Sequence, residues 1–448
     1  MCDAGWVGAE RTGVVACERL DAARAPGGYA LPSPMPASPN PFATIPEILD
    51  ELRAGRMVIL TDDEDRENEG DLVLPAQFAT PEAVTFMLRH ALGYLCLSLT
   101  EADCDRLGLH PQSSVNTTAR GTAFTVSIDL HVKHGGTTGV SAKERARCIQ
   151  MAVDPRFNAN DFVRPGHINP LRSRDGGVLV RNGQTEGSVD LCRLAGLHPA
   201  ACIIEIMRED GEMARVPDLV TFCNQHGIKM CSVAQIIQHR LSRESLITRL
   251  SPQGGHPLRT PEGEFRAHLF QSVVDPLPHL VLTVGDVGAG LAPSDTPTLV
   301  RMHRRHLLGD VFGDLSSSTD GTPSGQTLRD SMRMIQREGR GAIVYLRTSG
   351  GAVASGGVPG VGGVGGAAEE LGLADLESLL QAPRGKRGSV DDPNLAAAVM
   401  PLREYGVGCQ ILRALGLSRL RLISNSRRPL PGLEHFGLEI VGYEVAAG

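Results

Sequence analysis

The stretch RMVILTDDEDRENEGDLVLPA, residues 56–76, joins two apolar runs through a dense group of carboxylates. The flanking runs MVIL and DLVLP have the length and composition of short buried strands. Between them, seven of the eleven residues from Asp62 to Leu72 are acidic. Such a charge run by itself favours a solvated turn, although here the carboxylates also emerge at the end of a strand.

A calcium loop is the first specific hypothesis for this stretch. That loop needs acids at positions 1, 3 and 5, glycine at 6 and glutamate at 12. Counted from Asp65, the first four requirements are met, but position 12 is Ala76. The calcium-loop hypothesis therefore fails, and a strand, an acidic turn containing Arg66 and a second strand remain.

Strands and helices alternate on both sides of this unit. Helical spacing is found in residues 44–55, 80–92 and 216–227, with Thr80 as a predicted N-cap and Gly227 as a predicted stop. TAFTVSIDL, GGVLV and CIIEIM are typical of strands. The sequence predicts a mixed α/β (α+β) domain over residues 42–248.

Composition divides the rest of the chain. We predict a flexible N-terminal extension at 1–41, a linker at 249–262 and a smaller α/β domain at 263–448 with a Gly-rich insertion at 348–366. Helix and strand patterns in that smaller domain are interrupted by the insertion.

Charge and cysteine usage exclude several classes of protein. The formal net charge is -7, which argues against a general binder of nucleic acid or anionic membranes. No run approaches the roughly 18 apolar residues of a membrane span. The ten cysteines form no CxxC pair and mostly lie in apolar runs, which is typical of reduced thiols. We expect a cytoplasmic protein whose partners are small molecules or proteins.

Three further segments carry candidate chemistry. His167 lies in RPGHINPL behind Gly166, where the backbone can be approached closely. CIIEIM places Glu205 inside an apolar strand, so this carboxylate is either a paired structural group or an acid/base with a raised pKa. A third candidate, a phosphate cradle at the start of a helix near Glu186, comprises Arg181, Asn182, Gly183, Gln184 and Thr185.

Taken together, these pieces resemble the 3,4-dihydroxy-2-butanone 4-phosphate synthase family of riboflavin biosynthesis. The resemblance covers about residues 44–246. The matching segments, in chain order, are DDEDRENEGDL, YLCLSLT, GTAFTVSID, TTGVSAKERA, RPGHINPL, GGVLVRNGQTEGSVDL and EIMREDGEMARVPDL.

The resemblance implies a magnesium-dependent lyase, with manganese as a possible substitute, that converts ribulose 5-phosphate into 3,4-dihydroxy-2-butanone 4-phosphate and formate. Glu67 would ligate the metal, and His167 and Glu205 would form the acid/base pair. Carried over by motif position, the substrate-binding residues would be Arg66, Glu67, Asp71, Arg181, Asn182, Gly183, Gln184, Thr185 and Glu205.

One departure falls on the metal site. This family reads GHTEA where the chain reads GQTEG, so Gln184 stands in place of a metal-ligating histidine. A glutamine oxygen can ligate a hard ion, but it cannot take a proton. We expect reduced rather than abolished activity.

The second domain resembles GTP cyclohydrolase II through VRMHRRHLLGDVFG, REGRGAIVYLR and LREYGVGCQILRALGLSRLRLISNS. Where that family has three zinc-binding cysteines, this chain has His306, Ser317 and Thr319. Arg403 keeps the nucleophile's position, but Pro401 replaces the proton-accepting aspartate. We expect no zinc and no GTP hydrolysis.

Two hypotheses from different classes remain. The first is an active or weakened synthase with a degenerate second domain retained for folding, assembly or regulation. The alternative is a non-catalytic homologue that acts as a binding or regulatory protein. In either case the resemblance implies a homodimer.

Overall fold

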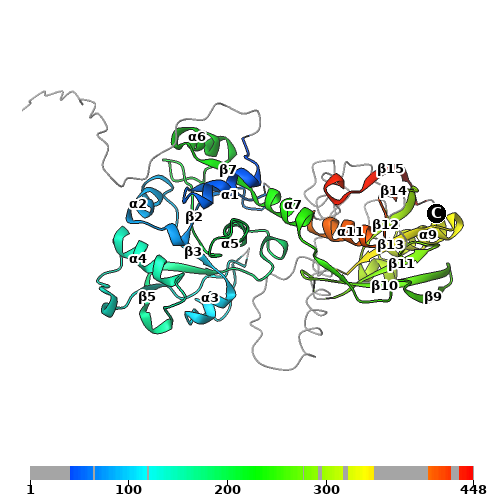
Figure 1. Cartoon of the computed structure of the whole chain (residues 1–448), viewed down its shortest axis with the longest axis horizontal. Coiled ribbons are helices and arrows are strands. Elements are labelled where there is room, and N and C mark those ends of the chain that lie inside the picture. Colours follow the sequence, from blue (N-terminus) through cyan, green and yellow to red (C-terminus); the bar gives the residue numbers. More distant parts are fainter. Residues whose placement is uncertain are drawn as a thin grey trace, which may run out of the picture.

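Two mixed sheets, each with its own helices, make up the chain (Figure 1). The structure is a computed structural model, and it describes residues 41–63, 66–118, 121–275, 277–290, 295–315, 321–347, 402–424 and 433–446. The predicted N-terminal extension, apart from its last residue, and the predicted Gly-rich insertion lie outside these residues. The mixed α/β class that the sequence predicts is confirmed.

The first sheet has the strand order β4-β5-β3-β6-β2-β1-β7. Its strands, in chain order, are β1 (Val58–Thr61), β2 (Gly70–Pro75), β3 (Cys96–Leu99), β4 (Ile128–Leu130), β5 (Phe162–Arg172), β6 (Ala201–Glu205) and β7 (Lys229–Ser232). β1 and β2 pair antiparallel, with Thr61 opposite Gly70, so the acidic stretch is the turn that joins two central strands.

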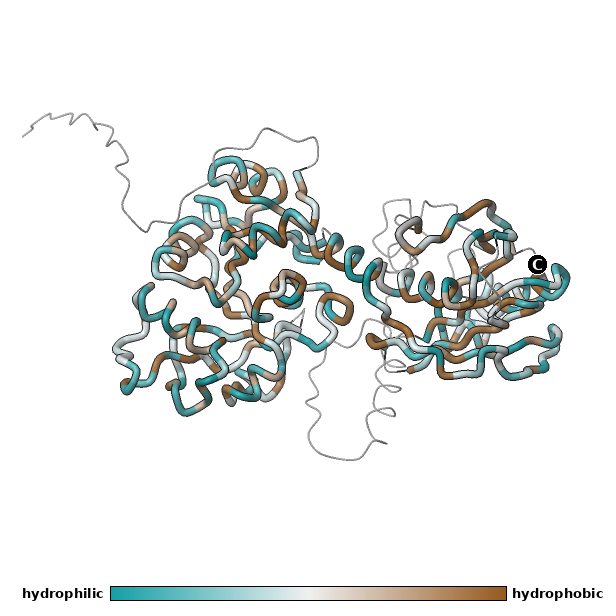
Figure 2. Tube along the Cα trace, viewed as in Figure 1, coloured by the Kyte–Doolittle hydropathy of each residue, from teal (hydrophilic) through white to brown (hydrophobic). Residues whose placement is uncertain are grey.

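Helices cover both faces of this sheet and bury two apolar cores. On one face pack α1 (Ile45–Arg53), α5 (Gln184–Leu194) and α7 (Val233–Arg243). On the other face pack α2 (Pro81–His90), α3 (Glu101–Arg106), α4 (Ala142–Ala152) and α6 (Val216–His226). Figure 2 shows hydrophobic stretches along the strands between these helices. The predicted N-cap Thr80 and the predicted stop Gly227 are confirmed.

The second sheet has the order β15-β14-β12-β13-β11-β10-β8, with β9 paired to β10. Its strands are β8 (Ile247–Arg249), β9 (His256–Thr260), β10 (Gly263–Ser272), β11 (His279–Val284), β12 (Thr298–Arg304), β13 (Gly341–Leu346), β14 (Arg419–Ile423) and β15 (Glu439–Glu444). The helices α8 (Leu307–Phe312), α9 (Ser324–Glu338) and α11 (Leu402–Ala414) accompany it. Part of the predicted linker 249–262 is therefore sheet, because β9 lies within it.

Helix α5 begins at Gln184, near Glu186 as predicted. Two other local predictions are wrong. GGVLV is not a strand: Gly177–Leu179 form the 3-10 turn η4, because Gly176 and Gly177 both take positive φ values. Glu205 ends β6 rather than lying inside an apolar strand, and it is only partly buried.

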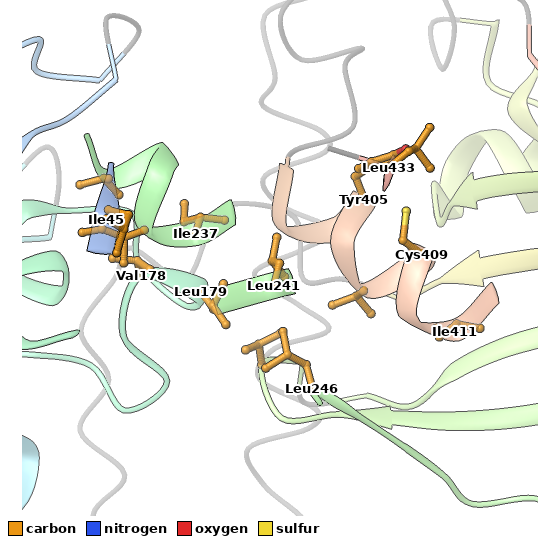
Figure 3. Packing of buried hydrophobic residues seen from close by; sticks show 14 of the residues in the cluster. Ile45, Val178, Leu179, Ile237, Leu241, Leu246, Tyr405, Cys409, Ile411 and Leu433 are labelled. Carbon is orange, nitrogen blue, oxygen red and sulfur yellow. The ribbon is translucent and has the colours of Figure 1, made fainter. Parts of the chain in front are cut away.

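The two sheets are connected through α7 without a break in the apolar core. α7 ends at Arg243, and β8 of the second sheet begins four residues later, at Ile247. Buried side chains of α7 and of α11 belong to one hydrophobic cluster (Figure 3). Among the described residues, no helix combines the length and apolarity that crossing a membrane requires.

Candidate active site

Three candidate side chains lie on one face and at one edge of the first sheet. Asp71 of β2 is directly opposite Glu205 of β6. Side chains two residues apart share a face, so both carboxylates project on the same side as Val73 and Ile203, which pack in the core beneath α5. His167 of β5 is two residues from Asn169, which pairs with Cys96 of that same core. The sheet thus presents His167, Glu205 and Asp71 toward the α5 side.

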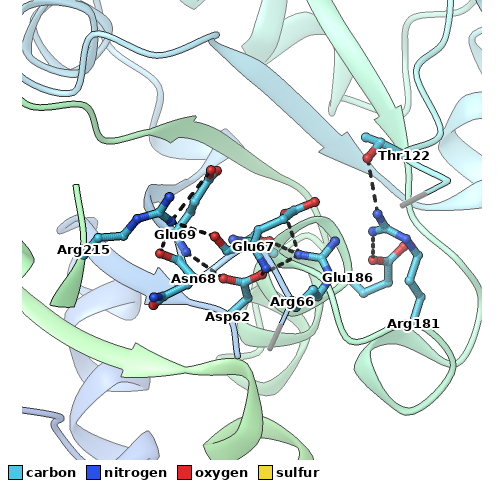
Figure 4. Close-up of polar contacts among 10 residues, drawn as sticks. Asp62, Arg66, Glu67, Asn68, Glu69, Thr122, Arg181, Glu186 and Arg215 are labelled. Atoms are coloured by element: carbon cyan, nitrogen blue, oxygen red, sulfur yellow. Dashed lines mark hydrogen bonds and ion pairs between the residues drawn. The ribbon is translucent and has the colours of Figure 1, made fainter. Parts of the chain in front are cut away.

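The acidic turn converges on one guanidinium nitrogen. Nη1 of Arg66 donates to Asp62 Oδ2 at 2.8 Å, to Glu67 Oε2 at 2.6 Å and to Gln184 Oε1 at 2.8 Å (Figure 4). That nitrogen carries two hydrogens, whereas three oxygens surround it. One guanidinium nitrogen therefore binds two carboxylates and the amide oxygen of Gln184 together.

Backbone contacts hold the turn in shape. Asp62 accepts hydrogen bonds from the backbone N–H groups of Glu67 and Glu69 at 3.0 and 2.8 Å. Arg215, just before α6, donates to the carbonyl oxygen of Glu67 at 2.7 Å and also bonds that of Asn68. Burial and the neighbouring Glu67 raise the pKa of Glu69, which reflects the negative potential of this turn.

The start of α5 forms a second positive region beside the turn. A Cβ on Gly183 would lie 2.5 Å from Arg181 Nη1 and 3.1 Å from Arg66 Nη2, so two guanidinium groups approach this backbone position. A side chain at this position would displace the Arg181 guanidinium. Gly183 is also the N-cap of α5 and has no side chain to cap the helix. The arrangement suits a phosphate group, because helix N–H groups and arginines both favour an anion.

Arg181 is held in this position by a buried carboxylate. Its Nη1 donates to Glu186 Oε2 at 2.7 Å, and its Nη2 lies 3.4 Å from Thr122 Oγ1. Burial raises the pKa of Glu186, and the Arg181 guanidinium opposes that shift. The other Glu186 oxygen accepts from the backbone N–H of Arg174 at 3.1 Å. Glu186 therefore fixes the guanidinium from the protein side.

His167 is oriented by Asp129 of β4. Asp129 accepts from the His167 backbone N–H at 2.9 Å and lies 2.7 Å from its ring Nδ1. A carboxylate at Nδ1 keeps the proton on that nitrogen and leaves Nε2 to exchange protons. The close approach predicted at Gly166 is confirmed, since a Cβ there would lie 2.1 Å from the carbonyl carbon of Ile128.

Glu205 and Asp71 form an adjacent pair of carboxyl groups in different surroundings. Glu205 Oε2 accepts from the backbone N–H of Tyr94 at 2.8 Å. Asp71 is only 4% exposed, and its Oδ1 has no hydrogen-bond partner among the described residues. Burial, and then the charge of Glu205, raise the pKa of Asp71 well above its usual value. The raised pKa of Asp71 makes it harder for this pair to carry two negative charges.

The structure brings most of the predicted site residues together. Arg66, Glu67, Gly183, Gln184 and Arg181 are joined by direct contacts or close approach. Asn182 is exposed beside them, whereas Thr185 is buried in the first turn of α5. Four supporting residues were not predicted: Asp62, Asp129, Glu186 and Arg215. Asp62 comes directly after the strand VILT, and that position could have singled it out.

The sequence profile of 3,4-dihydroxy-2-butanone 4-phosphate synthase matches residues 46–239 of the chain. The riboflavin biosynthesis protein RibBA of Aquifex aeolicus is 42% identical over 400 residues, which cover 89% of this chain and 91% of that protein. The chain belongs to the 3,4-dihydroxy-2-butanone 4-phosphate synthase family. Members of this family are lyases of riboflavin biosynthesis, so the predicted enzyme class is confirmed.

Other comparisons extend to the second domain. The GTP cyclohydrolase II profile matches residues 253–355 and 375–445, next to the synthase match. RibBA of Bacillus cereus (strain ATCC 14579) is 40% identical over 89% of this chain and 92% of its own. The crystal structure of RibBX, a two-domain synthase from A. baumannii, superposes with a TM-score of 0.65 at 32% identity and covers 91% of this chain and 100% of that chain. Both predicted family resemblances are thus confirmed.

Replacing Asp71 by asparagine tests the state of the carboxyl pair. An aspartic acid whose pKa is raised by folding binds its proton more tightly in the folded chain, so a pH above the ordinary aspartate pKa destabilises the fold until the group ionises. Asparagine has no such penalty. We expect the stability of the Asp71→Asn variant, relative to the unaltered chain, to increase as the pH rises above about 4, the ordinary aspartate pKa, by about 1.4 kcal/mol for each unit of raised pKa.

The measurement is urea denaturation of the metal-free protein, followed by circular dichroism across that pH range. Asp50→Asn, at an exposed position on α1, is the matched control and should show no such trend. A stability difference between Asp71→Asn and the unaltered chain that does not change with pH would contradict a raised pKa of Asp71.

Proposed function

We propose that the first domain converts ribulose 5-phosphate into 3,4-dihydroxy-2-butanone 4-phosphate and formate with the help of a divalent cation, magnesium or alternatively manganese. The observation that carries the proposal is the convergence of Glu67 and Gln184 on Nη1 of Arg66. It places two hard oxygen donors from separate elements around one cationic position, next to a phosphate-binding helix start.

The donor set is suited to magnesium. Glu67 supplies a carboxylate oxygen and Gln184 an amide oxygen, and magnesium commonly uses few protein ligands and keeps several waters. Bound there, the ion would stabilise negative charge on adjacent oxygens of the sugar. The Glu67 side chain is 30% exposed, so solvent and substrate oxygens can reach it.

The two arginines give the substrate its orientation. Arg181 and Thr185, with Asn182 and the backbone at Gly183, would bind the phosphate at the start of α5. Arg66 and Asp71 would contact the sugar between the phosphate and the carboxyl pair. The raised pKa of Asp71 favours its protonated form, which can donate a hydrogen bond that an ionised carboxylate could not.

His167 and Glu205 would carry the proton transfers. With Nδ1 facing Asp129, Nε2 of His167 can remove the proton on the carbon beside the ketone and form an enediol. Glu205, ordered by the Tyr94 N–H, can protonate the C1 hydroxyl so that it leaves as water. After the carbon skeleton rearranges, a water adds and C4 leaves as formate, so the atoms of the substrate are all recovered in the two products.

We also propose that the synthase is a homodimer. Several large apolar side chains are exposed in the described part of the first domain: Leu92, Tyr94, Val115, Val132, Val140 and Val163. A second copy would cover them. A sedimentation mass equal to that of one 47.7 kDa chain would exclude this assembly.

Formate release tests the synthase proposal directly. Purified chain should produce formate from ribulose 5-phosphate only when magnesium or manganese is present. Gln184→His should raise kcat/KM at limiting magnesium, because a ring nitrogen replaces a neutral amide. Gln184→Leu, which removes the oxygen, should lower kcat/KM by about tenfold or more, equivalent to about 1.4 kcal/mol of transition-state stabilisation.

Gln150→Leu is the matched control, since Gln150 on α4 donates to the carbonyl oxygen of Ala79 at 2.8 Å and lies outside the site. Its kinetics should equal those of the unaltered chain. If neither the unaltered chain nor Gln184→His releases formate with either metal, the synthase proposal is wrong.

We propose that the second domain does not hydrolyse GTP. Of the three residues at the cysteine positions, Ser317 and Thr319 are poor zinc ligands and lie, like Pro401, outside the described residues. His306 is described, and its Nδ1 accepts from the backbone N–H of Gly309 at 2.9 Å as the N-cap of α8. That ring nitrogen is already used by the backbone. The side chain of Arg403 is outside the described residues.

The expected result is zinc well below one equivalent by elemental analysis, together with no consumption of GTP when zinc is added. The same assay on the purified chain carrying Ser317→Cys and Thr319→Cys tests whether metal ligands alone were lost. GTP turnover by the unaltered chain would refute the proposal.

A further inference from the structure

A glutamine of the second domain caps a helix of the first. Nε2 of Gln410, on α11, donates to the carbonyl oxygens of Leu241 and Glu244 at 2.8 and 2.7 Å. Its Oε1 accepts from the backbone N–H of Leu246 at 2.8 Å. The last carbonyls of a helix have no partner within the helix, and α7 ends without a left-handed glycine cap. Gln410 therefore supplies the polar contacts that the end of α7 needs.

Apolar packing surrounds this cap. Leu241 and Leu246 are each only 2% exposed, and Figure 3 shows them between α7 and α11. A Cβ on Gly406 of α11 would lie 2.5 Å from Leu241 Cδ1, so the helix backbone contacts that side chain closely. The position of α7 is thus determined by the second domain through both hydrogen bonds and packing.

One turn before the capped end, Arg240 connects α7 to the site region. Its Nη1 donates to Asp190 Oδ2 on α5 and to the carbonyl oxygen of Gly176, both at 2.7 Å. Its other nitrogens bond Glu244 at 2.8 Å. The side chains of Arg240 and Asp190 are 9% and 1% exposed. A buried pair of this kind holds its geometry tightly, because displacing one partner leaves a buried charge unpaired.

Asp190 in turn fixes the segment that carries the phosphate-binding arginine. Its Oδ2 also accepts from the backbone N–H of Val178 at 2.9 Å, within η4. The backbone N–H of Arg181 donates to the carbonyl of Gly177 at 3.1 Å, which links Arg181 to the same turn. Asp190 itself lies on α5, whose first residues are Gln184 and Thr185. Both phosphate-binding elements are therefore attached to Arg240.

We propose that the second domain positions the phosphate-binding part of the synthase site through Gln410, α7 and the Arg240–Asp190 pair. In this arrangement Gln410, Arg240 and Asp190 are positioning residues that do not touch substrate. The effect on substrate affinity rests on the proposed synthase function, whereas the effect on the order of η4 and α5 does not.

Hydrogen–deuterium exchange of the full chain tests the mechanical connection. Gln410→Ala should increase exchange in α7 and in residues 176–187 while leaving α2 unchanged. Gln336→Ala is the matched control, because Gln336 on α9 donates to the carbonyl of Glu264 within the second domain, away from α7. It should leave residues 176–187 unchanged. Faster exchange confined to α7, or spread equally to α2, would overturn the proposal.

Steady-state kinetics then test the consequence for the site. Gln410→Ala should raise KM for ribulose 5-phosphate several-fold with kcat nearly unchanged, because uniform binding of the phosphate is lost and not a contact specific to the transition state. Gln410→Glu keeps the acceptor for the Leu246 N–H but loses the two donors. Its KM should therefore lie between those of the unaltered chain and Gln410→Ala. A fall in kcat at unchanged KM would contradict positioning. If the unaltered chain released no formate, the synthase proposal would fail. The hydrogen–deuterium exchange result would still decide whether the second domain positions η4 and α5.

Discussion

Nη1 of Arg66 joins the two parts of the polypeptide that the site requires. One part is the turn between β1 and β2, represented by Asp62 and Glu67, and the other is Gln184 at the start of α5. The side chain of Asp62 is completely buried, so its charge is tolerated because this guanidinium and two backbone N–H groups compensate it. Loss of one partner in such a buried pair costs about 3–5 kcal/mol, because the other charge is left buried and unpaired.

The order of the strands supplies the other half of the site. Because β2 and β6 are neighbours in antiparallel register, Asp71 and Glu205 must lie side by side, and burial together with the Glu205 charge raises the pKa of Asp71. In the strand order, β3 lies between β6 and β5. β5 places His167 on the same face of the sheet as the carboxyl pair. The carboxyl pair and the imidazole therefore project from the face of the sheet on which α5 packs.

Sequence patterns predicted most of the strands, the capped helices and the residue types of the site, because hydrophobic spacing and motif order are local properties. They did not predict η4, since GGVLV has the composition of a strand and only the positive φ values of its two glycines reveal a turn. Asp129 and Arg215 were also missed. Their roles depend on neighbours 38 residues or more away in the chain, His167 for the first and Glu67 for the second, and spacing in a single sequence does not report such contacts. The roles assigned to the site residues stay predictions.

The central claim is that Glu67 and Gln184 form the protein part of a divalent-cation site. Manganese binding, followed by the loss of the free-ion signal in electron paramagnetic resonance, tests it without any need for turnover. The account predicts one tight Mn²⁺ for each synthase domain, with clearly weaker binding in both Glu67→Gln and Gln184→Leu. Unchanged Mn²⁺ binding in those two variants would contradict it.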